Sequence, residues 1–105
     1  MVNSVGDMMK QAQQIQARLA KIQEEAGKKT VEASSGGNMV TATVSGRLEI
    51  ISLKIDDSVA AANDLEMLQD LVVAAVNEGI RRAQKMMASE MSQLTGGMNI
   101  PGLNT

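Results

Sequence analysis

The fold of this chain is decided by residues 30–55, which read TVEASSGGNMVTATVSGRLEIISLKI. Apolar and polar residues alternate in this stretch, most clearly where Val40, Ala42 and Val44 are separated by polar residues, and this period is typical of half-buried strands. Turn-forming residues interrupt the alternation at 35–38 and at 45–47. We therefore expect a three-stranded antiparallel meander, with strands near residues 30–34, 40–44 and 48–55.

The third strand carries apolar residues that a regular strand would place on opposite faces. Ile51, Leu53 and Ile55 fall on one face, whereas Leu48 and Ile50 fall on the other. A β-bulge near Ile50 would resolve this conflict, because it adds one residue to one strand of a pair.

A helical pattern precedes the meander over residues 4–26. Its apolar residues recur in a heptad-like seam, which is typical of a helix that packs along a partner helix. Ser4 is expected to cap the helix by accepting a hydrogen bond from the Asp7 amide, and Gly27 to end it in a left-handed conformation. The seam consists of Met8, Ala12, Ile15, Leu19, Ile22 and Ala26.

A second helical pattern follows over residues 64–94, with Asn63 or Asp64 as its cap. We expect residues 1–95 to form one domain and residues 96–105 a loose tail. The helix has one broad apolar side, which is wider than one face of a small sheet needs. That side carries Leu65, Leu68, Val72, Val73, Val76, Gly79, Ile80, Ala83, Met86, Met87, Met91 and Leu94.

Helices of about 35 and 46 Å must overhang strands of about 23 Å, so the fold class is α+β with projecting helical arms, in the order α-β-β-β-α. The wide apolar helix side and the exposed edges of the sheet favour a two-fold homodimer. The expected dimer and core seam contains Ile51, Leu53, Leu68, Val72 and Val76. In the expected arm, Met8, Ala12 and Ile15 face Ala83, Met87 and Met91.

The composition excludes most catalytic chemistry. The chain has no Cys and no His, hence no disulfide, thiolate nucleophile, imidazole base or ordinary zinc site, and we expect neither an enzyme nor a cofactor. It has no aromatic residue on which an unpaired base could stack. No apolar run approaches the length of a membrane span, which favours a soluble cytoplasmic protein with no membrane partner and no small-molecule substrate.

Charge is distributed unevenly along the chain, although the net charge is only −2. Basic residues exceed acidic ones between residues 8 and 29, whereas residues 56–70 contain five acids and no base. At about 100° per residue, the polar side of the first helix forms a stripe. Two groups are candidates for DNA phosphates: Lys10, Gln14, Arg18 and Lys21 in the stripe, and Arg81, Arg82 and Lys85 on the second helix.

Either group also has an ordinary structural explanation. Long polar side chains belong on the solvated face of a helix. Glu78 precedes Arg82 by four residues, which is the favourable order for an ion pair within a helix. It also precedes Arg81 by three.

Several short stretches of the chain together resemble the YbaB/EbfC family of bacterial nucleoid-associated proteins. They include residues 9–13, MKQAQ, residues 66–75, EMLQDLVVAA, and the pairs Ser45-Gly46, Ile55-Asp56 and Pro101-Gly102. Gln16, residues 23–25, Asn77 and residues 95–97 complete the pattern. The resemblance implies a tweezers-like homodimer with a helix, a three-stranded sheet and a long helix, which binds duplex DNA and alters its conformation.

The leading hypothesis is a non-enzymatic protein of the bacterial nucleoid that contacts mainly the phosphates of double-stranded DNA. The alternative is a protein-interaction or chaperone-like module, loosely similar to prefoldin. Such a module would use the methionine-rich end of the second helix, at Met86, Met87, Met91 and Leu94.

Overall fold

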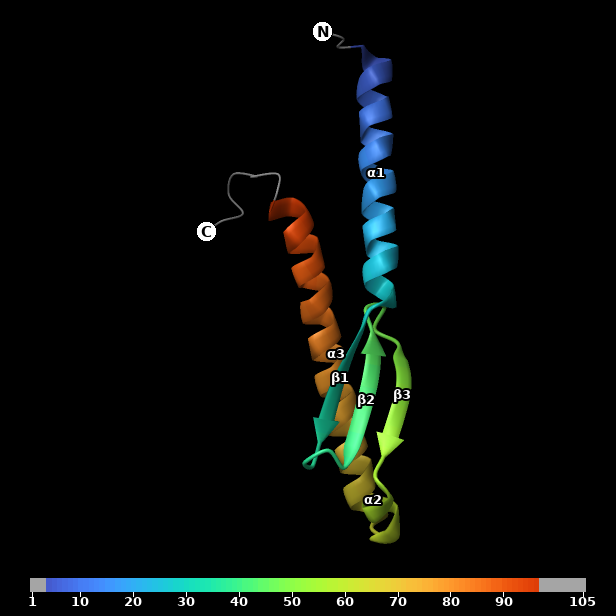
Figure 1. The fold of residues 1–105 in the computed structure, drawn as a ribbon, viewed down its shortest axis with the longest axis vertical. Helices are drawn as coiled ribbons and strands as arrows, with labels where there is room; N and C mark the ends of the chain where they lie inside the picture. Colours follow the sequence, from blue (N-terminus) through green and yellow to red (C-terminus); the bar gives the residue numbers. More distant parts are fainter. Residues whose placement is uncertain (1–3, 97–105) are drawn as a thin grey trace.

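The computed structural model describes residues 4–96, and the expected α+β order is confirmed with one short helix added. The molecule is elongated, with a longest dimension of 72 Å, and its first and last helices extend beyond one end of the sheet (Figure 1). Apart from Gly96, the expected tail at 96–105 lies outside the described residues. The elements are α1 (Val5–Lys28), β1 (Thr30–Ser35), β2 (Val40–Ser45), β3 (Ile50–Ile55), α2 (Asp57–Ala61) and α3 (Leu65–Gly96).

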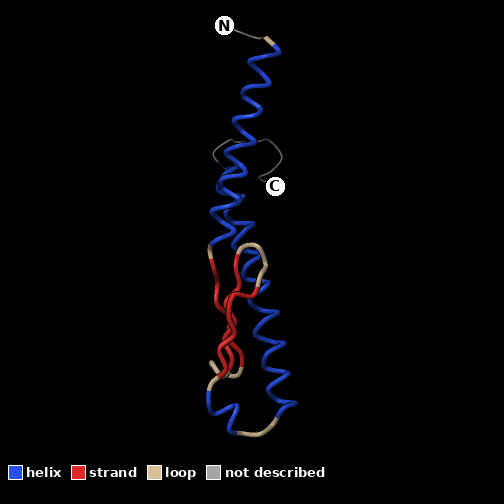
Figure 2. The backbone as a smooth tube through the Cα atoms, turned by 90° about the vertical axis from the view of Figure 1, so that its right-hand side faces the viewer, coloured by secondary structure: helices blue, strands red, loops and turns tan. Residues whose placement is uncertain are grey.

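The three strands form an antiparallel meander in the order β1-β2-β3, as predicted. Helix α3 lies against one face of this sheet, as Figure 2 shows, and packs on β1 and β2 rather than on β3. The core is centred on Val40 and Ala42 of β2 and on Ala75 of α3, all of them fully buried. Three residues of the expected seam, Leu68, Val72 and Val76, pack against this core within one protomer.

The predicted bulge is present, but it changes which residues of β3 share a face. Val44 pairs with Ile50, Ala42 with Leu53 and Val40 with Ile55, and the register shifts between Thr43 and Val44. Because directly paired residues point to the same side of a sheet, Ile50 shares the face of Leu53 and Ile55. The bulge therefore resolves the conflict for Ile50 as predicted, and Ile51 is the extra residue. Leu48 precedes the strand at a positive φ of 63°.

Helix α1 begins as predicted and ends differently. The Ser4 hydroxyl oxygen accepts a hydrogen bond from the Asp7 amide at 3.2 Å. Gly27 does not end the helix, which continues through Lys28 and is capped by Lys29 in an extended conformation. Gly27 is buried instead, because the Arg47 side chain lies against it. A Cβ at this position would lie 3.0 Å from the Arg47 Cγ.

Two carboxylates start the helices after the sheet. Asp56 caps the short helix α2, which the sequence pattern did not predict, by accepting a hydrogen bond from the Ser58 amide at 3.2 Å. Asp64 accepts one from the Met67 amide at 3.0 Å and so caps α3, which decides between the two predicted caps.

The expected pairing of residues between α1 and α3 is wrong, although the base of α1 contacts the last turns of α3. Ala83 is buried at the level of the sheet, and Met87 lies over the β2–β3 turn, where a Cβ on Gly46 would meet its Sδ at 2.7 Å. Only the last turns of α3 pass the sheet, and the N-terminal half of α1 rises beyond the described end of α3 (Figure 1). Met8 and Ile15 are consequently 63% and 53% exposed. The error arises because α3 starts at the far end of the sheet and uses most of its length to cross it.

Candidate nucleic-acid interface

The basic stripe of α1 is fully available to a ligand. Lys10, Gln14, Arg18 and Lys21 are all exposed, because α1 is buried only at its base, at Ala26 and Gly27. The three cations form no ion pair with any residue between 4 and 96. Lys10 and Gln14 share a shallow hollow with Asp7 and Gln11. The predicted stripe therefore exists as one continuous face of unpaired positive charge.

The basic residues of α3 are differently placed and two of them are engaged. The Arg81 Nε and Nη2 donate to Glu78 Oε2 at 3.1 and 2.8 Å, and Arg82 Nε donates to Glu78 Oε1 at 3.4 Å. These hydrogen bonds, of which the one from Arg81 has the largest effect, hold the pKa of the Glu78 carboxyl below its ordinary value of 4.5. Lys85 is exposed and forms no ion pair within the part of the chain that the structure describes.

The two basic groups do not share one projecting arm. Arg82 Nη1 donates to the backbone carbonyl of Glu32 in β1 at 2.8 Å, so this group lies beside the sheet. The α1 stripe lies on the free arm. A ligand that contacts both groups of one protomer must therefore extend from the arm down to the β1 side of the sheet.

Two further exposed cations, Lys28 and Arg47, lie at the base of α1. The sequence pattern did not single them out. Lys28 follows Lys21 by seven residues, which is about two helical turns, so the same periodicity could have identified it. Arg47 lies in a turn, where no periodicity applies, and only the packing of the turn against α1 reveals its position.

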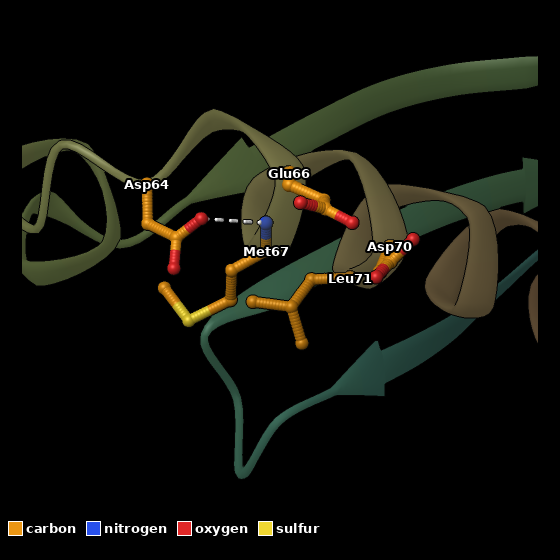
Figure 3. A pocket seen from close by; sticks show the side chains of 5 residues that line it. All are labelled: Asp64, Glu66, Met67, Asp70 and Leu71. Atoms are coloured by element: carbon orange, nitrogen blue, oxygen red, sulfur yellow. Dashed lines mark hydrogen bonds between the residues drawn. The ribbon is translucent and has the colours of Figure 1, made fainter.

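One hollow on the surface of the described chain is acidic. It has a volume of about 370 Å³ and lies at the start of α3, where Asp64, Glu66 and Asp70 line it together with Met67 and Leu71 (Figure 3). Within residues 4–96, no group of three or more carboxylates is placed to hold a metal ion. Negative charge at this end of the molecule disfavours a polyanion there, so a nucleic acid is better accommodated at the opposite, α1 end.

The apolar residues of β3 remain uncovered. Ile51 and Leu53 are 58% and 39% exposed, and Ile50 and Ile55 on the same strand are also exposed. The other edge strand, β1, is hydrogen-bonded to α3. Arg82 donates to the Glu32 carbonyl, and the Ser35 hydroxyl donates to the Leu71 carbonyl. The β3 side of the sheet is therefore the open side, and two of the five expected seam residues, Ile51 and Leu53, lie on it.

The methionine-rich end of α3 is partly covered by the rest of the chain. Met86, Met87 and Met91 are half-buried, and the side chain of Leu94 lies outside the described residues.

Across residues 4–96, the helices lack the combination of length and apolar character that crossing a membrane requires.

Comparison with known proteins identifies the family to which this chain is similar. Residues 2–98 match the sequence model of the YbaB/EbfC DNA-binding family. A nucleoid-associated protein of Thermoanaerobacter pseudethanolicus is 52% identical over 100 residues, which cover 95% of this chain and 90% of that protein. One of Syntrophobacter fumaroxidans is 54% identical over 95 residues, covering 90% and 86%. The crystal structure of an uncharacterized Helicobacter pylori protein matches with a TM-score of 0.69 at 22% identity, covering 92% of this chain and 98% of that one, and so shares the fold.

Proposed function

Because the chain belongs to the YbaB/EbfC DNA-binding family, we propose that it is a nucleoid-associated protein that binds duplex DNA as a homodimer, mainly through phosphate contacts from α1. The observation that carries this proposal is the row of unpaired cations on the exposed face of α1. The family is one of DNA-binding proteins, so we infer no enzymatic activity.

The α1 stripe suits a phosphate backbone in its spacing. Lys10 and Lys21 are separated by about 16 Å along the helix axis, at about 1.5 Å per residue, so the stripe spans several phosphates of one duplex. Gln14 adds an amide that donates hydrogen bonds to phosphate oxygens. Since no aromatic residue exists to stack on a base, the contacts address the backbone and carry little sequence information. Net charge does not oppose this, because much of the acidic charge lies at the far, α2 end.

The homodimer is proposed from the open side of the sheet. A second copy that covers the β3 side would bury Ile51 and Leu53, at about 25 cal/mol per Å² of apolar surface. The two-fold operation places two α1 arms on one assembly, so the dimer presents two cationic faces to one duplex. We propose that binding between the two arms alters DNA conformation and, through it, nucleoid organisation and gene expression.

A salt titration with a fluorescent random-sequence duplex tests the proposal. If the dimer neutralises about six phosphates, log affinity should fall with log salt with a slope near −5. Replacing Lys10, Arg18 and Lys21 by Gln, a good helix former, should reduce the affinity at least about 100-fold and flatten the slope, while circular dichroism stays unchanged.

Lys54→Gln is the matched control, because it removes a positive charge from the sheet rather than from α1. A parent protein that does not bind the duplex at low salt, or a triple variant that binds as tightly as Lys54→Gln, would overturn the proposal. Binding of a protein partner that survives in the triple variant and is lost on changing Met86 and Met91 would instead favour the protein-interaction alternative. Co-localisation with the nucleoid in cells tests the proposed location.

A further inference from the structure

The basic stripe of α1 continues past Lys21 to the base of the arm. Lys28 follows Lys21 by seven residues, which places the two side chains about 20° apart around the helix. Its one ion pair within residues 4–96, with Glu24, is long at 3.7 Å and is largely exposed, so a stronger anion can replace it. The stripe thus reaches the point where α1 joins the sheet.

Arg47 joins the stripe there from a different element. It belongs to the turn between β2 and β3, and it lines one cavity of about 310 Å³ together with Lys28, Thr30, Ser45 and Ile51. Because Ile51 also belongs to the proposed dimer interface, the second copy would border this cavity. The Arg47 side-chain stem lies along Gly27, with Cγ and Nε at 3.0 and 3.2 Å from the place of a Cβ on that glycine. The absence of a side chain at residue 27 therefore allows Arg47 to lie beside Lys28.

The turn that carries Arg47 is fixed before any ligand arrives. The Gly46 amide donates to the Lys29 carbonyl at 2.9 Å. The buried Ser45 hydroxyl oxygen accepts hydrogen bonds from the amides of Arg47 and Glu49, both at 3.3 Å. Little backbone freedom is therefore left to be lost in this turn when the guanidinium binds, which favours affinity.

The guanidinium itself is uncommitted. Arg47 forms no ion pair with any residue in the described range 4–96, although Glu49 lines the same cavity. Guanidinium groups match phosphate oxygens in a bidentate geometry, and the Thr30 hydroxyl adds a donor beside it. The cavity is open to solvent, and its volume of about 310 Å³ has room for a phosphate group.

We propose that Lys28 and Arg47 bind one backbone phosphate of the duplex whose neighbouring phosphates lie along α1. This inference rests on the proposed function, and it extends the DNA contact from the arm onto the sheet. Duplex DNA would then run from Lys10 at the tip towards the β2–β3 turn, rather than across the tip of α1. Glu49 opposes this phosphate and limits the affinity of the site.

The inference is tested on the full chain by replacing Arg47 with Gln and titrating salt against the same fluorescent duplex. The affinity should fall about 5- to 20-fold, and the salt slope should become shallower by about 2, one lost phosphate contact per protomer of the dimer. Arg47→Lys should restore most of both, because the charge and the stem remain. Glu49→Gln should tighten binding about 2- to 5-fold.

Controls separate this inference from the proposed function and from a structural role. If Arg47→Gln binds as tightly as the control Lys54→Gln and keeps the parent slope, the inference is overturned while the proposed function stands. If the parent protein fails to bind the duplex at low salt, both are overturned. Damage to the turn would lower the urea midpoint and leave the salt slope unchanged, and this result would also overturn the inference.

Discussion

Gly79 of α3 passes so close to Val44 of β2 that a Cβ at residue 79 would lie 2.7 Å from the Val44 Cγ2. Val44 is among the largest fully buried side chains that the structure describes, so it cannot move away to make room for a Cβ. The missing side chain of Gly79 therefore allows α3 to lie this close to the sheet.

Gly79→Ala is therefore expected to destabilise the protein by about 1–3 kcal/mol, although alanine favours a helix by about 1 kcal/mol over glycine. Urea unfolding followed by circular dichroism measures the change. Gly6→Ala is the matched control, because the nearest atom to a Cβ there is the Ser4 hydroxyl oxygen at 3.8 Å. That variant should be neutral or slightly stabilising, and equal effects at the two positions would contradict the close crossing.

Glu78→Gln is expected to tighten DNA binding. Glu78 holds both Arg81 and Arg82, and the loss of its charge releases Arg81 in particular to a phosphate. We expect the affinity to rise about 2- to 5-fold and the salt slope to steepen. Glu66→Gln removes the same charge at the far end of α3 and should change binding less. Equal gains in both variants would mean that only the net charge matters.

The same carboxylate should make stability fall in acid. Its pKa is held below the ordinary 4.5 by the Arg81 hydrogen bond, so it stabilises the fold above about pH 4.5 and loses that contribution as the pH falls through the lowered pKa. Asp56, whose pKa is lowered by its hydrogen bonds from Ser58, adds a loss at lower pH. The urea midpoint should drop between about pH 5 and pH 3, and Glu78→Gln should drop less. An identical pH dependence in the variant would refute this role.

A charge on the β3 side should separate the proposed homodimer. Ile51→Glu and Leu53→Glu place carboxylates where the second copy would bury apolar surface, which should weaken dimerisation at least about 100-fold. Sedimentation velocity measures the effect, and circular dichroism should stay unchanged because both residues are exposed in one protomer. Ser52→Glu, which pairs with Thr43 on the opposite face, is the control. Dimers that persist in both apolar variants would place the interface elsewhere.

The sequence predicted the elements of this fold better than their packing. Alternation identified the strands, and the conflict between Ile50 and Ile51 located the bulge, because both are local properties of the chain. The position of Met87 over the turn at Gly46 depends on where α3 begins to cross the sheet, and periodicity carries no information about this offset. For the same reason the α1 stripe could be found in advance, whereas Arg47, brought to it by a turn, could not.

The N-terminal half of α1 has almost no tertiary support, and this has a thermodynamic consequence. An isolated helix shorter than about 12–15 residues is marginal in water, so the amides near Lys10 should exchange their hydrogens far faster than those of α3 at Ala75. A ligand that binds the arm must therefore keep the N-terminal half of α1 helical in the complex. Association should therefore carry an unfavourable entropy, and affinity should decline on warming more steeply than charge pairing alone would require.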